Sequence, residues 1–329
     1  MLNRRFVLKS ALAAGLSAPF VRMARAAFPS EVIRIQVPFA AGGNIDVQCR
    51  LIAQRMNQLL NTSVIVENRT GAGGTIGAEG VARSKPDGYN LLAGSNGPMT
   101  VSPAVRTKIG YDPIKDFAPV VLTSRVPMVL AVGKDFPART LAEYVAYAKA
   151  NPDKVTVASS GVGSSSHLVI VDFGMTTDTK LVHVPYRGAA ATVPDLISGS
   201  VNSVVTELPN VLAVHNDSKA RILGVAASSR SKLLPDIPTF SEAGVANFEA
   251  ASFCGLLAPA GTPAEIIETL RKAVITSLAD PEISKKFDAM ALEIPQPKDL
   301  TSQAFTDLLM KELAAAKRVA TAAKIKVDN

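Results

Sequence analysis

Short apolar runs alternate with amphipathic segments along most of the chain, and this alternation predicts strands and helices in turn. The opening unit is an apolar strand and a helix with apolar residues every three or four positions, joined by a glycine-rich turn over 40–44. The elements predicted for this first series are a strand over 33–39, a helix over 47–60, a strand over 63–67, a glycine-rich loop over 71–77, a helix over 78–83 and a strand over 89–93. Repeated strand–helix units predict a parallel sheet covered by helices.

A second series begins after two long apolar segments, 118–122 and 127–132, which we interpret as a strand crossing to another sheet. The elements predicted beyond it are a helix over 141–150, a strand over 155–159, a Ser/Gly loop over 160–165, a helix over 166–173, a strand over 181–184, a helix over 191–198, strands over 201–206 and 222–226, an apolar run over 253–258, and helices over 264–278 and 301–323. This pattern predicts an α/β chain of two lobes with a cleft between them, where ligands bind at the carboxyl ends of the strands. We place 27–126 plus 250–329 in the first lobe and 127–249 in the second.

Residues 1–26 have a basic start, an apolar middle and a small-residue end, which is typical of an export signal. The apolar part is shorter than the about 20 residues that a membrane span needs. The pair Arg4-Arg5 comes close to a twin-arginine signal, and an ordinary secretory signal remains the alternative. We therefore expect an exported protein whose mature chain starts near Ala27.

The net charge of +7 on these 329 residues suggests a nucleic-acid ligand only until the charges are located. Five basic residues lie in the export signal, and without them 30 basic and 28 acidic residues leave a net charge of +2. The chain has no Trp and no basic cluster beside aromatic residues, so we expect no nucleic-acid partner. An apolar share of 47% with 19% charged residues indicates a globular protein rather than a disordered one.

Metal and dinucleotide sites are not predicted. Two Cys and three scattered His lack the spacing of metal ligands. Cys49 and Cys254 each lie in the apolar pattern of a separate element, so we expect two buried thiols that are not paired. The glycines of loop 71–77 follow a strand, but Ile76 stands where a dinucleotide-binding loop needs its third glycine. We expect no cofactor.

Two loops that join a strand to a helix, 40–44 and 159–167, are the candidate binding elements. A helix N-terminus offers free N–H groups and the positive end of the helix dipole, and glycine lets a ligand approach the backbone. The second loop is also rich in serine, with His167 beside it, so a hydrolase is an alternative. No G-x-S-x-G motif is present, however, and capping explains the serines. Because neither loop contains Lys or Arg, backbone amides would have to neutralise a bound carboxylate.

Several motifs together resemble the extracytoplasmic solute-binding proteins of tripartite tricarboxylate transporters, also called Bug receptors. The stretches that carry the resemblance are VPFAAGGNID over 37–46, VENRTGAGGTIGA over 66–78, PDGY over 86–89, VPYRG over 184–188, LPDIPT over 234–239, EAG over 242–244 and GLLAPAGTP over 255–263. The resemblance implies a two-lobed periplasmic binding protein fold (type II-like), in which each lobe is a mostly parallel sheet flanked by helices. It further implies a periplasmic, non-enzymatic protein that closes over a small carboxylate.

The resemblance also implies the ligand contacts. They are Phe39, Gly43, Asn44, Ile45 and Asp46 in the first lobe, and Ser160, Gly163, Ser164, Ser165, Ser166, Tyr186 and Glu207 in the second. The chain departs from the family pattern at the site itself. Asn44-Ile45 replaces a common Pro-Thr/Ser, and Thr206-Glu207 replaces a common Phe/Thr-Asp. Phe253 stands where Trp or Tyr is frequent.

The ligand class implied is a di- or tricarboxylate, or an aromatic or amino-acid carboxylate, and the implied partner is a two-component membrane permease. We expect a monomer. A receptor that presents its ligand to a membrane sensor is an alternative to delivery to a permease. Arg187, the only cation near the candidate contacts, is expected to face solvent, because Tyr186 is expected to face the ligand and neighbours on extended backbone point oppositely.

Overall fold

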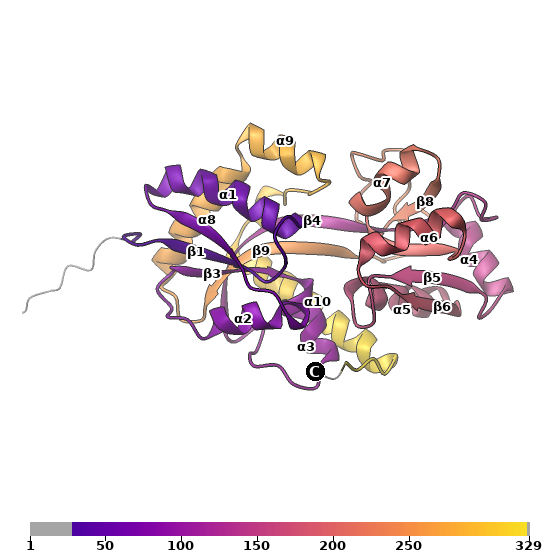
Figure 1. Cartoon of the computed structure of the whole chain (residues 1–329), viewed down its shortest axis with the longest axis horizontal. Helices are drawn as coiled ribbons and strands as arrows, with labels where there is room; N and C mark the ends of the chain where they lie inside the picture. Colours follow the sequence, from indigo (N-terminus) through magenta and orange to yellow (C-terminus); the bar gives the residue numbers. More distant parts are fainter. Residues whose placement is uncertain (1–27, 328–329) are drawn as a thin grey trace, which may run out of the picture.

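The computed structural model describes residues 28–327, so the expected export signal lies outside the described residues. Figure 1 shows two lobes side by side, joined by the long strands β4 (Phe117–Gly133) and β9 (Ala251–Pro259). The first lobe contains strands β1 (Ile33–Val37), β2 (Val64–Asn68) and β3 (Asn90–Ser95), with helices α1 (Asn44–Leu60), α2 (Thr75–Ala82), α3 (Ser102–Val105), α8 (Ala264–Leu278), α9 (Pro281–Ala289) and α10 (Ser302–Ala322). The second contains strands β5 (Val155–Ser159), β6 (Leu181–Pro185), β7 (Ser203–Glu207) and β8 (Ala220–Val225), with helices α4 (Leu141–Ala150), α5 (Ser165–Thr177), α6 (Thr192–Ser198) and α7 (Pro209–Asn216).

The sheet order explains how the lobes are joined. In the first lobe β2, β1 and β3 are parallel neighbours, and β9 and β4 follow as antiparallel strands. In the second lobe β6, β5 and β7 are parallel, and both β7 and β8 pair antiparallel with β4. The single strand β4 therefore belongs to both sheets, and pairs with β9 up to Pro127 and with β7 from Met128. The two apolar segments predicted around residues 118–132 form one continuous crossing strand.

Alternating side chains bury both faces of the first sheet. Leu91 and Leu256 face α1 and α8, whereas their neighbours Leu92 and Leu257 face α2 and α10. All four of these leucines are fully buried. Each fully buried leucine stabilises the lobe by roughly 1.5–3 kcal/mol relative to an exposed one. The second sheet is covered in the same way, with α4 and α5 on one face and α6 and α7 on the other.

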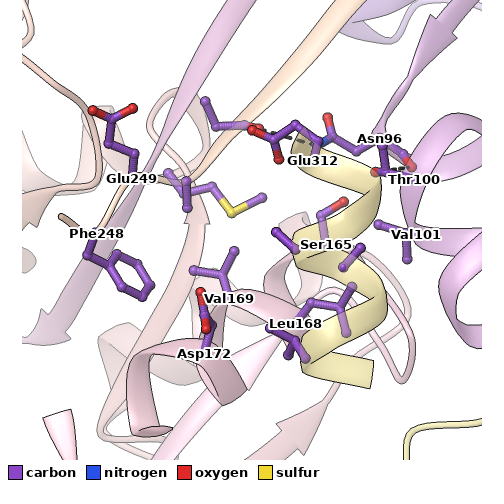
Figure 2. Close-up of a pocket in the computed structure, with 16 residues that line it drawn as sticks. Asn96, Thr100, Val101, Ser165, Leu168, Val169, Asp172, Phe248, Glu249 and Glu312 are labelled. Atoms are coloured by element: carbon purple, nitrogen blue, oxygen red, sulfur yellow. Dashed lines mark hydrogen bonds between the residues drawn. The ribbon is translucent and has the colours of Figure 1, made fainter. Parts of the chain in front are cut away.

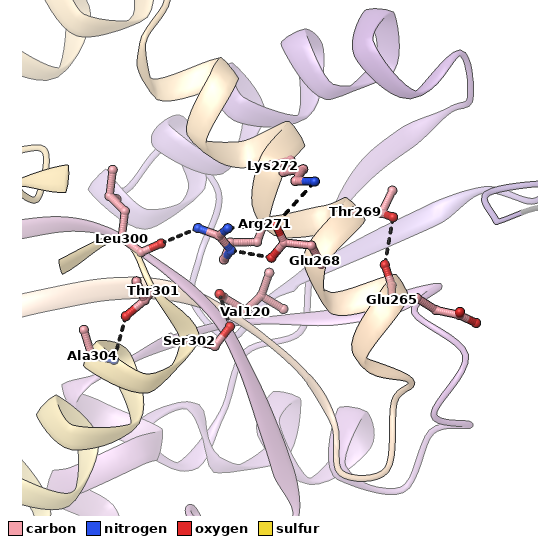
Figure 3. A network of polar contacts seen from close by, with 10 residues as sticks. All are labelled: Val120, Glu265, Glu268, Thr269, Arg271, Lys272, Leu300, Thr301, Ser302 and Ala304. Atoms are coloured by element: carbon pink, nitrogen blue, oxygen red, sulfur yellow. Dashed lines mark hydrogen bonds and ion pairs between the residues drawn. The ribbon is translucent and has the colours of Figure 1, made fainter. Parts of the chain in front are cut away.

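Helix α10 starts on the first lobe, and its last turns contact both lobes. Its start is fixed by a polar network (Figure 3). Ser302 donates to the carbonyl of Val120 in β4 at 2.9 Å, and Arg271 of α8 donates to the carbonyl of Leu300 at 3.0 Å. The last turns of α10 pack with Leu168 of α5 and with Val101 and Val105. The helix thus forms a second physical link between the lobes, besides the crossing strands.

Helices α3, α7 and α9 and the irregular segment η2 (Gly97–Val101) were not expected from the sequence. Helices α7 and α9 each have proline in the first turn, at Pro209 and Pro281, and η2 and α3 contain Pro98 and Pro103. Proline ends a helix when it lies inside one, but it favours the first turn, where its missing N–H would be unbonded in any case. Proline in these segments is therefore compatible with helix starts.

Among residues 28–327, no helix is both long and apolar enough to cross a lipid bilayer. Within the same range, no cluster of three His, Cys, Asp or Glu side chains could hold a metal ion. Cys49 and Cys254 are both free and both buried, and they lie in the same core cluster. Hydrogen bonding to Cys254 and burial raise the pKa of the Cys49 thiol well above its usual value.

Candidate functional site

The loop between β1 and α1 presents a bare helix N-terminus. Gly43 caps α1 in an extended conformation (φ −75°) and supplies no side-chain acceptor to the first N–H groups. Asn44 and Ile45, the first residues of the helix, are half-buried. Because the 17-residue helix also has its positive dipole end here, this loop is suited to bind an anion.

Asp46 holds this loop in shape. The carboxylate is 2% exposed and accepts hydrogen bonds from the Gly42 amide at 2.9 Å, from Asn68 Nδ2 at 2.9 Å and from Arg50 Nε at 3.0 Å. Burial alone would raise the pKa of Asp46, but the hydrogen bonds from Arg50, Gly42 and Asn68 outweigh burial and lower the pKa to about 2. Asn68 also donates to the Phe39 carbonyl at 3.0 Å. These bonds tie the loop to the carboxyl end of β2.

The loop between β5 and α5 is closed by its own serines. Ser164 is the N-cap of α5 and accepts from the His167 amide at 3.2 Å. The buried Ser166 hydroxyl bonds to the Ser160 amide at 3.0 Å and to the Ser160 hydroxyl at 2.9 Å. Gly163 has a positive φ of 69°, and a Cβ there would lie 2.7 Å from the Val327 side chain of the first lobe. The loop therefore combines a capped helix start with close contact across the cleft.

The two loops belong to facing edges of the lobes. Glu207, at the carboxyl end of β7, accepts from Asn44 Nδ2 of the first lobe at 3.5 Å and from Ser252 Oγ of β9 at 2.6 Å. Burial raises the pKa of Glu207, although the hydrogen bonds from Ser252 and Asn44 oppose that effect. Within residues 28–327, no Lys or Arg forms an ion pair with this carboxylate. Both residues of this cross-lobe contact are departures from the family pattern.

Other expected contacts also have structural partners. Tyr186 follows β6, and its hydroxyl donates to Asp195 of α6, which raises the pKa of Tyr186 to about 12. Arg187 is exposed, as expected. Phe39 is half-buried, and its ring lies beside the backbone of Gly74 and Gly97. Phe253 is buried against Phe305 of α10 rather than in the loops.

Ser165, one of the expected contacts, lines a well-defined cavity (Figure 2). This cavity of about 80 Å³ lies between α5, α10 and the crossing strands, and Glu249 and Glu312 lie on its wall. Burial raises the pKa of Glu312. A second cavity of about 580 Å³ has none of the expected contacts in its wall. The first cavity is small and acidic, so neither cavity fits the expected carboxylate site as well as the facing loops do.

Sequence reasoning missed two residues that shape these loops. Asn68 is the last residue of β2, so its position at the carboxyl edge of a strand was a usable signal. Ser252 lies in the crossing strand β9, and no local pattern marks it, because its partner Glu207 is distant in sequence. His183, at the end of a predicted strand, contacts Ser159 of the second loop.

The chain matches the family model described as "Tripartite tricarboxylate transporter family receptor" over residues 48–324. The chain belongs to this family. The family consists of solute-binding proteins, and the two-lobed binding-protein fold expected from the sequence is confirmed by its solved members.

Protein BugT of Bordetella pertussis is 33% identical over 277 residues, which are 84% of this chain and 84% of BugT. MatC of Rhodopseudomonas palustris, solved with bound malate, is 32% identical with a TM-score of 0.74, and the match covers 89% of this chain and 99% of MatC. A second R. palustris protein, solved with adipate, is 32% identical with a TM-score of 0.77 over 92% of this chain and 100% of that one. The resemblance inferred from the motifs is therefore confirmed.

Proposed function

We propose that this protein captures a small dicarboxylate in the periplasm and delivers it to a two-component permease of the tripartite tricarboxylate type. The observation that supports the proposal is the glycine-capped N-terminus of α1, whose first residue Asn44 contacts Glu207 of the second lobe, the lobe that also carries the N-terminus of α5. Two related proteins were solved with malate and with adipate, which supports a dicarboxylate as the ligand. We propose that the protein acts as a monomer.

The expected contacts divide into two roles in this proposal. The amides of Gly43, Asn44 and Ile45 bind one end of the ligand, and those of Ser165 and Ser166 bind the other. Phe39 bounds the apolar side of the first loop. The remaining expected contacts position the loops, because their polar atoms already have partners; these are Asp46, Ser160, Gly163, Ser164, Tyr186 and Glu207.

Hydrolysis is not favoured by the arrangement of the serines. A serine nucleophile must be accessible and must be activated by a base. Ser159 contacts His183 Nε2 at 2.5 Å but is fully buried. His167 accepts from the Gly163 amide and not from a serine. The protein therefore should show no turnover of carboxylic esters.

Three substitutions test the amide mechanism without disturbing the fold. At Gly43 an added Cβ would meet only the Ala40 carbonyl, at 3.6 Å, so Gly43→Val folds and places its side chain at the ligand. Ser165 is the first residue of α5, where proline is tolerated, and Ser164 has the extended backbone that precedes proline. Ser165→Pro therefore removes one amide donor. Arg187→Ala is the matched control, because it removes the positive charge near the expected contacts and leaves the backbone amides in place.

We expect Gly43→Val and Ser165→Pro to abolish binding of the dicarboxylate, and Arg187→Ala to weaken it by less than about tenfold, or roughly 1.4 kcal/mol. Mass spectrometry of whatever co-purifies with the protein identifies the ligand, and titration calorimetry with that ligand, malate and adipate measures the affinities. If Arg187→Ala lost binding while Gly43→Val kept it, the Arg187 guanidinium and not the backbone amides would bind the carboxylate of the ligand. The amide mechanism would then be wrong.

The partner is tested separately from the ligand. Delivery to a permease predicts that the gene lies beside genes for a two-component integral membrane permease. A gene for a membrane sensor in that position, without permease genes, would favour signalling instead.

A further inference from the structure

Two histidines stack directly beneath the second loop. The rings of His167, in the first turn of α5, and His183, in β6, are nearly parallel at 8° with centroids 3.8 Å apart. His167 is buried and His183 is half-buried. The described residues contain one further histidine, His215 in α7, which accepts from the Ile222 amide at 3.3 Å. The binding role proposed above uses neither imidazole of the stacked pair.

Each stacked ring supports one backbone amide of the loop. His167 Nδ1 accepts from the Gly163 amide at 3.1 Å. His183 Nε2 contacts Ser159 Oγ at 2.5 Å, and that hydroxyl accepts from the Gly161 amide at 3.1 Å. Gly161 and Gly163 both have positive φ, so these bonds fix the two most unusual backbone conformations in the loop. The same turn places Gly163 against Val105 and Val327 of the first lobe.

We propose that His167 and His183 are positioning residues that hold the ligand loop in its binding conformation only while both rings are neutral. An imidazole accepts at Nδ1 only when the proton resides on Nε2, and a protonated ring has no acceptor left. Protonation of His167 would remove the partner of the Gly163 amide and turn Gly163 away from the first lobe. The proposal rests on the binding function proposed above, because it assigns a role to the same loop.

The surroundings keep the pair neutral. Burial and the neighbouring His183 lower the pKa of His167 to about 4, and burial lowers the pKa of His183. Other charged groups nearby have their own partners. Asp172, further along α5, pairs with Arg318 of α10, Asp195 of α6 accepts from Tyr186, and Arg106 lies in the bridge with Val327. Because the histidine pKa is lowered, the hydrogen bonds that the neutral rings accept are fully formed above about pH 6.5. They are lost as the pH falls toward 4 and the rings become protonated.

The test compares His167→Asn, which keeps an acceptor near the place of Nδ1 but cannot titrate, with His167→Leu, which removes the acceptor. His215→Asn is the matched control, since that histidine lies outside the loop. His183→Phe keeps a stacked ring and removes the partner of Ser159. Nuclear magnetic resonance of the unliganded protein follows the Gly161 and Gly163 amides from pH 7 to pH 3, and the tautomer of each imidazole. Calorimetry at pH 7 with malate and adipate gives the affinities.

We expect the Gly163 amide shift to move with a midpoint near pH 4 in the wild type and in His215→Asn, and to stay flat in His167→Asn. His183→Phe should move the Gly161 amide at pH 7. His167→Asn should keep affinity within about threefold, and His167→Leu should lose at least about tenfold. The same pH response in His167→Asn as in the wild type would overturn the proposal, and so would an Nδ1–H tautomer of His167. If His167→Leu does not fold, the His167→Asn comparison still decides.

Failure to bind any dicarboxylate would contradict the proposed function but not this inference, because the amide and tautomer measurements need no ligand.

Discussion

At the scale of single residues, Asp46 shows how a buried carboxylate can support the loop that we propose to bind an anion. Its negative charge lies buried beneath the first loop and is balanced by Arg50 and by amide donors, so the outer face of the loop keeps free N–H groups. A carboxylate left without these donors would repel the ligand. The family's acidic residue at this position therefore acts on the loop conformation in this chain.

Asp46→Ala should lower the free energy of unfolding at pH 7 by roughly 1.5–3 kcal/mol, the range for hydrogen bonds to a charged group. The pKa of Asp46 is lowered to about 2 from 3.8, so its contribution is present above pH 3.8 and is lost as the pH falls through 2. The difference in the free energy of unfolding between Asp46→Ala and the wild type should therefore become smaller in acid. Urea unfolding at pH 7 and pH 3 measures it, with the exposed Asp236→Ala as the control. A difference in the free energy of unfolding that is the same or larger at pH 3 would show that the charge of Asp46 is not what stabilises the loop.

The sequence predicted both strand-to-helix loops that carry candidate residues, because strand and helix patterns alternate on either side of them. The sequence could not show which candidate residues would contact the ligand and which would hold the loops in shape. That division depends on bonds between residues far apart in the chain, such as Ser252 with Glu207 and Asn68 with Asp46. The histidine stack is another case, since a residue in α5 and one in β6 meet only after the lobe has folded.

At the scale of elements, α10 was predicted as a helix but not as a link between lobes. Its apolar pattern is evident in the sequence, whereas the partners of that pattern change along the helix, from Phe253 at its start to Leu168 near its end. Periodicity shows which face is buried and not which lobe covers it. Helices α7 and α9 were missed for a different reason, because proline in a first helical turn resembles proline in a loop.

The apolar contact should hold the end of α10 more strongly than its ion pair does. Arg318 and Asp172 are 2.8 Å apart, but the Arg318 side chain is 56% exposed, so Arg318→Ala should cost less than about 1 kcal/mol of stability. Val319 is 3% exposed, and Val319→Ala should cost about 1–3 kcal/mol. Urea unfolding of the two variants gives the comparison, and a larger cost for Arg318→Ala would show that the link is electrostatic.

At the scale of the whole molecule, the contact between Asn44 and Glu207 links the two lobes at 3.5 Å. A hydrogen bond of this length is at the weak end of the range, but a contribution of about 1 kcal/mol would still shift an equilibrium between open and closed lobes about fivefold. We predict that this contact favours the arrangement in which the lobes lie close together.

Glu207→Ala should expand the unliganded protein, because it removes the acceptor for both Asn44 and Ser252. Small-angle X-ray scattering should give a larger radius of gyration for this variant than for the wild type. Glu242→Ala, which removes an exposed carboxylate of the same lobe, should leave the radius unchanged. Equal radii for Glu207→Ala and the wild type would mean that the contact does not hold the lobes together.

Because β4 belongs to both sheets, the strands of the two lobes are completed at different times during synthesis. The second lobe takes all of its strands from one continuous stretch that ends with β8, so it can be completed while the ribosome is still adding residues. The first lobe cannot, since its sheet has a gap between β3 and β4 until β9 has been made. The edge of β3 in the first lobe therefore stays without its neighbour until β9, in the final quarter of the chain, has been made.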